Sequence, residues 1–259
     1  MAELQLSHYM PSAAYKAVRQ GHEPHSTPVM IDIEAGVRLQ TDKHVQKYLL
    51  CEGCEQRFSR NGEDHVLSQM CRRGGKFKLR DLMNNAEPSR VAGGNRIFLA
   101  ENMPPEVNAD AYAYFALSIF WRGAVTDWGK AFHNFRDALG SRYHEKFRQF
   151  LLGKAEFPNK AFVKVHVDFD TNSQTGLEPP HQGKASVEGN YRFRCHNFLI
   201  PGIQFELLLG GNVDALVKDS ASLTTSNVMF SEWYYSKSER RRGWASRINK
   251  TEAKGKLAS

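Results

Sequence analysis

The sequence contains little cysteine and no long hydrophobic run. Four of its 259 residues are cysteines, too few for a scaffold built on disulfides. No stretch approaches the roughly 18 consecutive apolar residues that a membrane-spanning helix needs. The first ten residues have neither a basic start nor a continuous apolar core, so we expect no signal peptide, no membrane association and a cytoplasmic protein. In that compartment cysteines are more commonly thiols or metal ligands than disulfides.

The overall composition is that of a globular protein with a basic surface. Hydrophobic residues make up 41% of the chain and charged residues 24%, which is enough for a proper core in one large or two modest domains. The net charge of +7 favours an anionic partner, and nucleic acid is the usual one.

The middle and the C-terminal half show clear periodic patterns. Residues 110–121 are apolar on nearly all sides, which predicts a buried helix, and an amphipathic helix is expected from about Lys130 to Leu152. From Ala161 apolar residues alternate with polar ones, which predicts a strand with one dry face. We expect a β-hairpin over residues 191–209 and one more strand over residues 228–235.

The N-terminal third predicts a smaller mixed unit. We expect a short strand that ends near His8 and further strands around Gly36. Helices are expected over residues 42–50 and 63–70, and a polar loop over residues 84–95. We therefore predict an α+β fold: a treble-clef-like ββα module, a central buried helical pair and a C-terminal antiparallel sheet. The predicted boundaries are residues 1–85 for the module, 86–236 for the helices and sheet, and 237–259 for a disordered basic tail.

One motif stands out in the N-terminal unit, the Cys-x-x-Cys pair formed by Cys51 and Cys54. A tight turn of this length places two thiolates on one tetrahedral metal, so the pair predicts a structural zinc site. Such a site needs two further ligands, and the candidates are His8, His22, His25, His65 and Cys71. The alternative is a pair of plain thiols; a thioredoxin-like redox role is less favoured because no βαβ pattern surrounds the motif.

Together with residues further upstream, this motif resembles an uncharacterised bacterial group of HNH-like, treble-clef endonuclease relatives. That group reads Ser-His-x-x-Pro, then Tyr-Leu-Leu-Cys-x-x-Cys-Glu-x-x-Phe-Ser, then Gly-Glu. The matching residues here are His8, Pro11, Cys51, Cys54, Glu55, Phe58, Ser59, Gly62 and Glu63. The chain departs from the group's pattern in three ways. Ser7 stands where an acidic residue or histidine usually precedes the catalytic histidine, Glu55 replaces an asparagine, and no Cys-x-x-Cys precedes His8.

The resemblance implies a metal-dependent nuclease that hydrolyses DNA, with defence against foreign DNA as the role such families suggest. His8 would be the general base, with Glu63 and Asn61 as further catalytic residues. Glu55, His65 and His8 would hold or position metal, with Asp64 in the same group, and the catalytic ion would be Mg²⁺ or Mn²⁺. The alternative without catalysis is that His8 is a hydrogen-bonded histidine at a strand end and that residues 63–65 form a solvated helix face.

Basic residues follow the motif and predict contacts to nucleic-acid phosphates. They are Arg57, Arg60, Arg72, Arg73, Lys76 and Lys78. If catalysis is absent, the alternative function is a zinc-stabilised module that binds nucleic acid or protein. The pattern His166-x-Asp168-x-Asp170 could bind a metal ion, but a solvated outer strand face accounts for it more simply.

Overall fold

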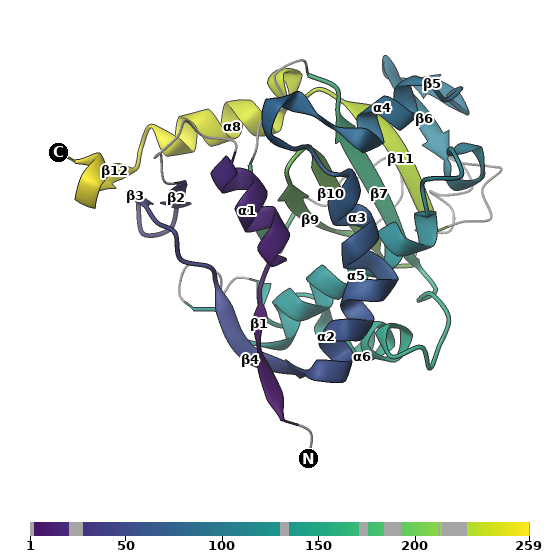
Figure 1. The fold of residues 1–259 in the computed structure, drawn as a ribbon, viewed down its shortest axis with the longest axis horizontal. Coiled ribbons are helices and arrows are strands. Elements are labelled where there is room, and N and C mark those ends of the chain that lie inside the picture. Colours follow the sequence, from purple (N-terminus) through teal and green to yellow (C-terminus); the bar gives the residue numbers. More distant parts are fainter. Residues whose placement is uncertain are drawn as a thin grey trace.

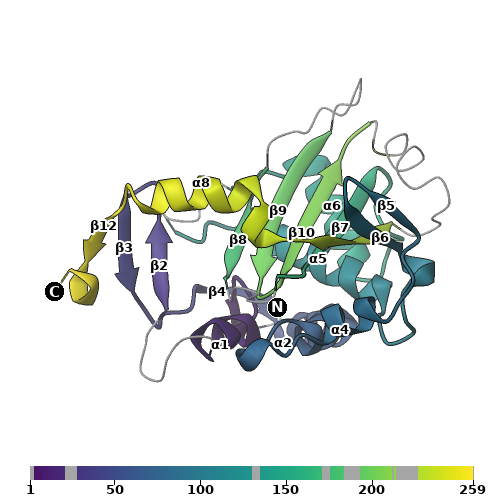
Figure 2. The ribbon, with the colours of Figure 1, turned by 90° about the horizontal axis from the view of Figure 1, so that it is seen from above.

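The computed structural model describes residues 3–20, 28–129, 135–170, 176–183, 193–211, 213 and 227–258. Within these ranges the protein is a mixed α+β structure, as predicted. Figure 1 and Figure 2 show a large sheet covered on one face by helices, and a small sheet at the far end of the long axis. No helix in the described ranges is long and apolar enough to cross a membrane.

The large sheet has seven strands in the order β5-β6-β11-β7-β10-β9-β8. Their bounds are β5 Arg90–Ala92, β6 Asn95–Leu99, β7 Ala161–Asp168, β8 Glu178–Gln182, β9 Arg194–Ile200, β10 Ile203–Leu209 and β11 Val228–Trp233. All neighbours are antiparallel except β7 and β11, which are parallel. The predicted antiparallel sheet is therefore present, and it also contains one parallel pair.

Local patterns account for the centre of this sheet. Val163, Val165 and Val167 are all fully buried against the helices, because alternate side chains of β7 point to the same face. The predicted hairpin is formed by β9 and β10 around Pro201 and Gly202, whose φ of +79° suits glycine. Tyr191 and Arg192, which the prediction included, lie outside the described residues.

The expected polar loop over residues 84–95 is wrong in part, because β5 and β6 form a hairpin there. Gly93 and Gly94 take φ values of +58° and +78°, which two-residue turns between antiparallel strands require. The two strands are only three and five residues long, and Ile97, Phe98 and Leu99 are consecutive apolar residues, so no alternating period marks this hairpin in the sequence.

Helices lie on one face of the large sheet, and α5 (Ala109–Val125) is the central one. Residues 111–124 are all buried, which confirms the helix predicted to be apolar on all sides. The Asn108 side chain caps it by accepting a hydrogen bond from the Ala111 N–H at 3.1 Å. The second predicted helix, α6 (Gly140–Leu151), packs against α5 but is shorter than expected. Residues 130–134 of the prediction lie outside the described ranges, and residues 135–139 form turns.

A two-stranded ribbon and a long helix form the N-terminal unit. β1 (Leu4–His8) pairs antiparallel with β4 (Gln46–Cys51), so the helix predicted over residues 42–50 is wrong. After β4 the chain continues as α2 (Glu52–Phe58), a π-helical turn (Ser59–Glu63) and α3 (Asp64–Gln69). Gly62, in the π-helical turn, lets this helix approach α5: a Cβ at Gly62 would lie 2.8 Å from the Phe115 backbone nitrogen.

The remaining elements connect these parts. They are α1 Ser12–Gln20, β2 Val29–Asp32, β3 Val37–Gln40, α4 Lys78–Asn84, α8 Glu239–Ile248 and β12 Glu252–Lys254, with 3₁₀ turns at Arg73–Gly75, Ala100–Asn102, Tyr235–Lys237 and Gly255–Leu257. The strands expected around Gly36 are confirmed as β2 and β3. The segment expected as a disordered tail instead forms α8 and β12, and β12 pairs parallel with β3 in the small sheet (Figure 2).

Candidate functional site

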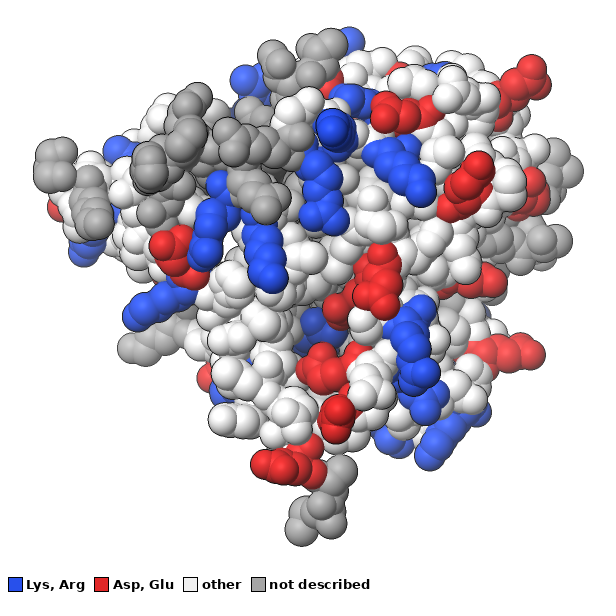
Figure 3. Space-filling model, in the orientation of Figure 1, with Lys and Arg blue, Asp and Glu red and all other residues white. Residues whose placement is uncertain are grey.

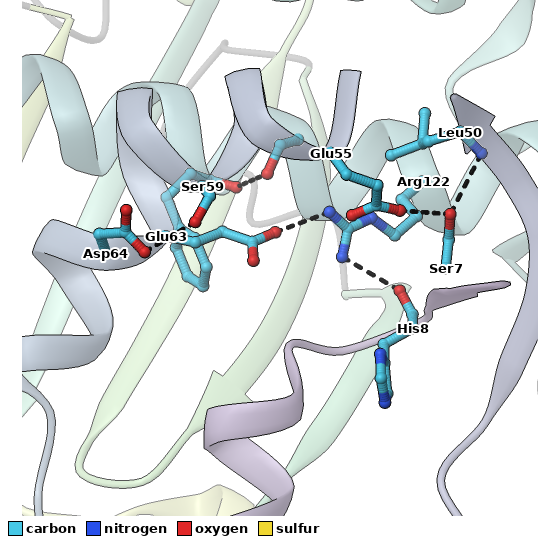
Figure 4. Close-up of polar contacts among 10 residues, drawn as sticks. Ser7, His8, Leu50, Glu55, Ser59, Glu63, Asp64 and Arg122 are labelled. Carbon is cyan, nitrogen blue, oxygen red and sulfur yellow. Dashed lines mark hydrogen bonds and ion pairs between the residues drawn. The ribbon is translucent and has the colours of Figure 1, made fainter. Parts of the chain in front are cut away.

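Polar side chains from β1, the α2–α3 helix and α5 meet at the inner side of the ribbon (Figure 4). We call this group the Arg122 cluster; it consists of Ser7, His8, Glu55, Glu63 and Arg122. The Ser7 hydroxyl donates to the Glu55 carboxylate and accepts the Leu50 N–H at 3.1 Å. Ser7 is 1% exposed, so these contacts satisfy a buried hydroxyl and tie β1 to β4 and α2.

Arg122 is the buried cation at the centre of this cluster. Its side chain is 2% exposed although it lies on the otherwise apolar helix α5. One Nη atom donates to the Glu63 carboxylate at 2.7 Å, and the other donates to the His8 carbonyl oxygen at 3.0 Å. The guanidinium also lies 5.5 Å from the centre of the Phe58 ring. A buried cation needs partners of this kind, because an isolated charge is costly to remove from water.

The His8 imidazole faces away from Arg122 toward the ribbon and α1. Its Nε2 lies 3.1 Å from Nδ1 of His44 and 2.9 Å from the amide nitrogen of Gln46. Burial lowers the pKa of His8, and the nearby His44 and Arg122 lower it further, against the opposing effect of Glu55. A lowered pKa favours the neutral imidazole, and its Nε2 accepts the Gln46 amide proton because an amide nitrogen can only donate.

His44 and Arg122 were not among the residues predicted from the sequence. His44 stacks on Tyr15 with ring centres 4.4 Å apart, and its pKa is also lowered, chiefly by burial. Neither residue belongs to the motif, so motif spacing gave no signal for them. An arginine within the apolar run of α5 was the one available hint, because an unpaired arginine is almost never fully buried.

The other predicted catalytic and metal residues are spread along the helix. Glu63 is in the cluster through Arg122, whereas the polar partner of Asn61 is the Tyr114 hydroxyl. Asp64 accepts from Ser59 at 2.7 Å. His65 lies on α3, and its Nε2 accepts the N–H of Asn108, the residue before α5, at 3.1 Å.

The two motif cysteines lie together at the junction of β4 and α2. Both are free and half-buried. The pKa of Cys51 is lowered, first by the Cys54 backbone N–H and then by its thiol, whereas burial and the neighbouring Cys51 raise the pKa of Cys54. Among the described residues no group of three or more His, Cys, Asp and Glu side chains is arranged to hold a metal ion. Of the other candidate ligands, Cys71 is buried against Pro201 and Gly202, and His22 and His25 lie outside the described residues.

The predicted phosphate-contacting residues do not form one patch. Arg57 and Arg60 lie on the first half of the long helix, and Arg72, Lys76 and Lys78 follow its other end; the Arg73 side chain is outside the described part. Arg57, Arg60 and Arg72 each donate to a backbone carbonyl, of Leu152, Gln56 and Leu67 respectively. Figure 3 shows Lys and Arg side chains in several groups around a central acidic group.

The residues of the His166-x-Asp168-x-Asp170 pattern have protein partners, so they do not form a solvated strand face. His166 hydrogen-bonds Ser231 at 2.7 Å and Glu206 at 2.9 Å. Asp168 is 2% exposed and accepts the Asp170 N–H at 3.1 Å; burial raises its pKa to about 6. The pattern belongs to a cross-strand polar network on the outer face of the large sheet.

No protein-family model, curated protein or solved structure matches this chain.

Proposed function

We propose that this chain is an HNH-like nuclease that hydrolyses phosphodiester bonds in nucleic acid, with His8 as the general base. The observation that carries the proposal is a half-buried imidazole at the end of β1, whose pKa is lowered chiefly by burial and on which the charge of the Glu55 carboxylate of α2 acts in the opposite direction. A general base must be unprotonated at the working pH, and the lowered pKa of His8 meets that condition. The pairing of β1 with β4 and the helix α2 directly after β4 also support the proposal.

His8 would take the proton of the attacking water on Nε2. The Gln46 amide donates to that atom in the free protein, so it has to move aside when the water binds. The hydrogen bond from Arg122 to the His8 carbonyl holds the end of β1 in place during this exchange. His44 stays in contact with the imidazole and limits its rotation.

Glu55 is the residue best placed to bind a divalent ion. Mg²⁺ is commonly held by one or two carboxylates together with water and substrate phosphates, so a single carboxylate is within the usual range. Ser7 orients the Glu55 carboxylate through its hydroxyl. Mg²⁺ or Mn²⁺ would stabilise the charge that develops on the phosphate oxygens. Glu63 is less suited, because Arg122 already neutralises it.

The test is cleavage of plasmid DNA, single-stranded DNA and RNA in Mg²⁺ or Mn²⁺. We expect His8→Ala to reduce the rate at least about 100-fold, the lower range for a general base, and Glu55→Gln to weaken the dependence on the metal. Gln46→Ala should retain cleavage, because it only removes the competing donor. His181→Ala on the edge strand β8 is the matched control and should cleave like the wild type. Equal rates for wild type and His8→Ala would refute the proposal, as would no cleavage under any condition.

A second candidate is a zinc-stabilised module that binds nucleic acid or protein without cleaving it. The pairing of Glu63 with Arg122 favours it, because the Arg122 guanidinium then occupies the carboxylate as its cation in place of a catalytic metal ion. In that case nucleic acid should bind without cleavage, and Lys76→Ala with Lys78→Ala should reduce both the affinity and its dependence on salt. Fluorescence anisotropy at 50 and 200 mM salt measures this.

A further inference from the structure

The Cys51–Cys54 pair offers two thiols to a metal ion, and among the described residues no further His, Cys, Asp or Glu joins them in a metal-holding group. Zinc in structural sites takes four sulfur or nitrogen ligands. His8 is four residues along β1 from Leu4, the partner of Cys51, which is about 13 Å at 3.3 Å per residue. His65 is eleven residues along the helix from Cys54, about 16 Å at 1.5 Å per residue. Neither histidine can therefore complete the site without a large rearrangement.

The same end of the ribbon carries exposed apolar side chains. Leu4 and Leu6 are each 48% exposed, and Tyr48 is 68% exposed. Cross-strand partners share a face, and Leu4 pairs with Cys51 while Leu6 pairs with Tyr48. Leu4 and Leu6 are two residues apart on β1, and the bulge between Gln5 and Leu6 absorbs the extra residue of β4, so all four residues lie on one face of the ribbon. Figure 1 shows this end of β1 and β4 at the edge of the molecule, where another chain has access.

We propose that two copies of this chain share one zinc ion, with Cys51 and Cys54 of each copy as its four ligands. A twofold axis brings the same patch of both copies together, so a Cys-x-x-Cys pair next to the axis meets its own copy and supplies two plus two thiolates. The same contact covers Leu4, Leu6 and Tyr48. The inference rests on the proposed zinc site but not on nuclease activity.

The charge of the zinc centre and the small apolar contact area both fit a dimer held by the metal. Four thiolates on Zn²⁺ leave a net charge of −2, and each copy places the cationic Arg57 near its Cys54. Three exposed side chains are few for a stable interface, since specific complexes bury roughly 800 Å² on each partner. The dimer should therefore depend on the metal rather than on apolar contacts alone.

The experiment measures zinc per chain and molecular mass in solution, with and without a chelator. We expect one zinc per two chains and a dimer that becomes a monomer in EDTA or in Cys51→Ser/Cys54→Ser. Replacing zinc with Co²⁺ should give the absorption of a four-thiolate tetrahedral site. Tyr48→Ser keeps all the thiols and should raise the dimer dissociation constant at least about tenfold. Val91→Ser removes a similarly exposed apolar side chain on β5 and should change nothing.

Three results would overturn the inference: one zinc per monomer, no bound zinc, or a dimer that persists in EDTA. His8→Ala separates it from the nuclease proposal, because this residue lies at the other end of the ribbon. That variant should remain a zinc-dependent dimer whether or not the wild type cleaves nucleic acid.

Discussion

Two buried polar groups of this protein are built in different ways. The Arg122 cluster joins residues from a strand and two helices, and its central contact links Arg122 to Glu63, 59 residues earlier. The second group, here called the His166 cluster, lies on the outer face of the large sheet and consists of Ser231, His166, Glu206 and Cys195. Its members occupy four adjacent strands, so strand pairing alone brings them together. The first cluster depends on how helices pack, whereas the second depends on register.

Loss of the arginine should have the largest effect on the Arg122 cluster. Arg122→Met leaves Glu63 without its cation and the His8 carbonyl without its donor, in a site where Arg122 is 2% exposed and Glu63 17% exposed. Removing one partner of a buried ion pair costs about 3–5 kcal/mol. We expect a loss near 3 kcal/mol in urea unfolding, since Glu63 retains some access to water.

The double variant Arg122→Met/Glu63→Gln tells whether that loss comes from the unpaired charge. It should recover part of the stability, because an uncharged pair avoids burying a lone carboxylate. A double variant no more stable than Arg122→Met would show that packing around α5, and not the ion pair, is what the arginine provides.

The His166 cluster should respond to acid. Burial raises the pKa of Glu206, but the hydrogen bond and charge of His166, with Lys164 and Cys195, outweigh this and lower it to about 2. A carboxyl whose pKa is lowered on folding stabilises the protein above its unfolded pKa of about 4.5, and this contribution is lost as pH falls toward 2. We expect the wild type to lose about 2–3 kcal/mol across that window relative to Glu206→Gln.

The measurement is denaturant unfolding of both proteins at intervals between pH 5 and pH 2.5. Glu178→Gln, on the edge strand β8, is the control for removing a carboxylate from the same sheet. Parallel curves for wild type and Glu206→Gln would mean that Glu206 is not stabilised as an anion, and that the two clusters do not differ in the way described.

The sequence predicted the elements whose signal is local and missed what depends on distant partners. Alternation along β7, the Pro201-Gly202 turn and the apolar run of α5 are each visible within a short window, and all are confirmed. A helix was expected over residues 42–50, but residues 46–50 belong to β4, because pairing with β1 about forty residues away outweighs local propensity. Arg122 was missed for the same reason: its partners are known only once α5 is packed against the α2–α3 helix.

A substitution at the close contact between α5 and the α2–α3 helix should have the smallest effect on stability of those proposed here, and a glycine elsewhere in the same helix provides its control. A Cβ at Gly62 would lie 2.8 Å from the Phe115 nitrogen and 3.1 Å from the Ala111 carbonyl oxygen, both backbone atoms that cannot turn aside. Gly62→Ala should therefore cost about 1–3 kcal/mol, the usual range for overpacking. Gly53→Ala, in α2 of the same helix, meets nothing within 4 Å and should be neutral or stabilise by up to about 1 kcal/mol, since alanine favours helix. The close contact at Gly62 positions Glu63 beside Arg122. Combining Gly62→Ala with Arg122→Met should therefore reduce the free energy of unfolding by less than the sum of the two single losses. Strictly additive losses would mean that the helix contact and the Arg122 cluster are independent of each other.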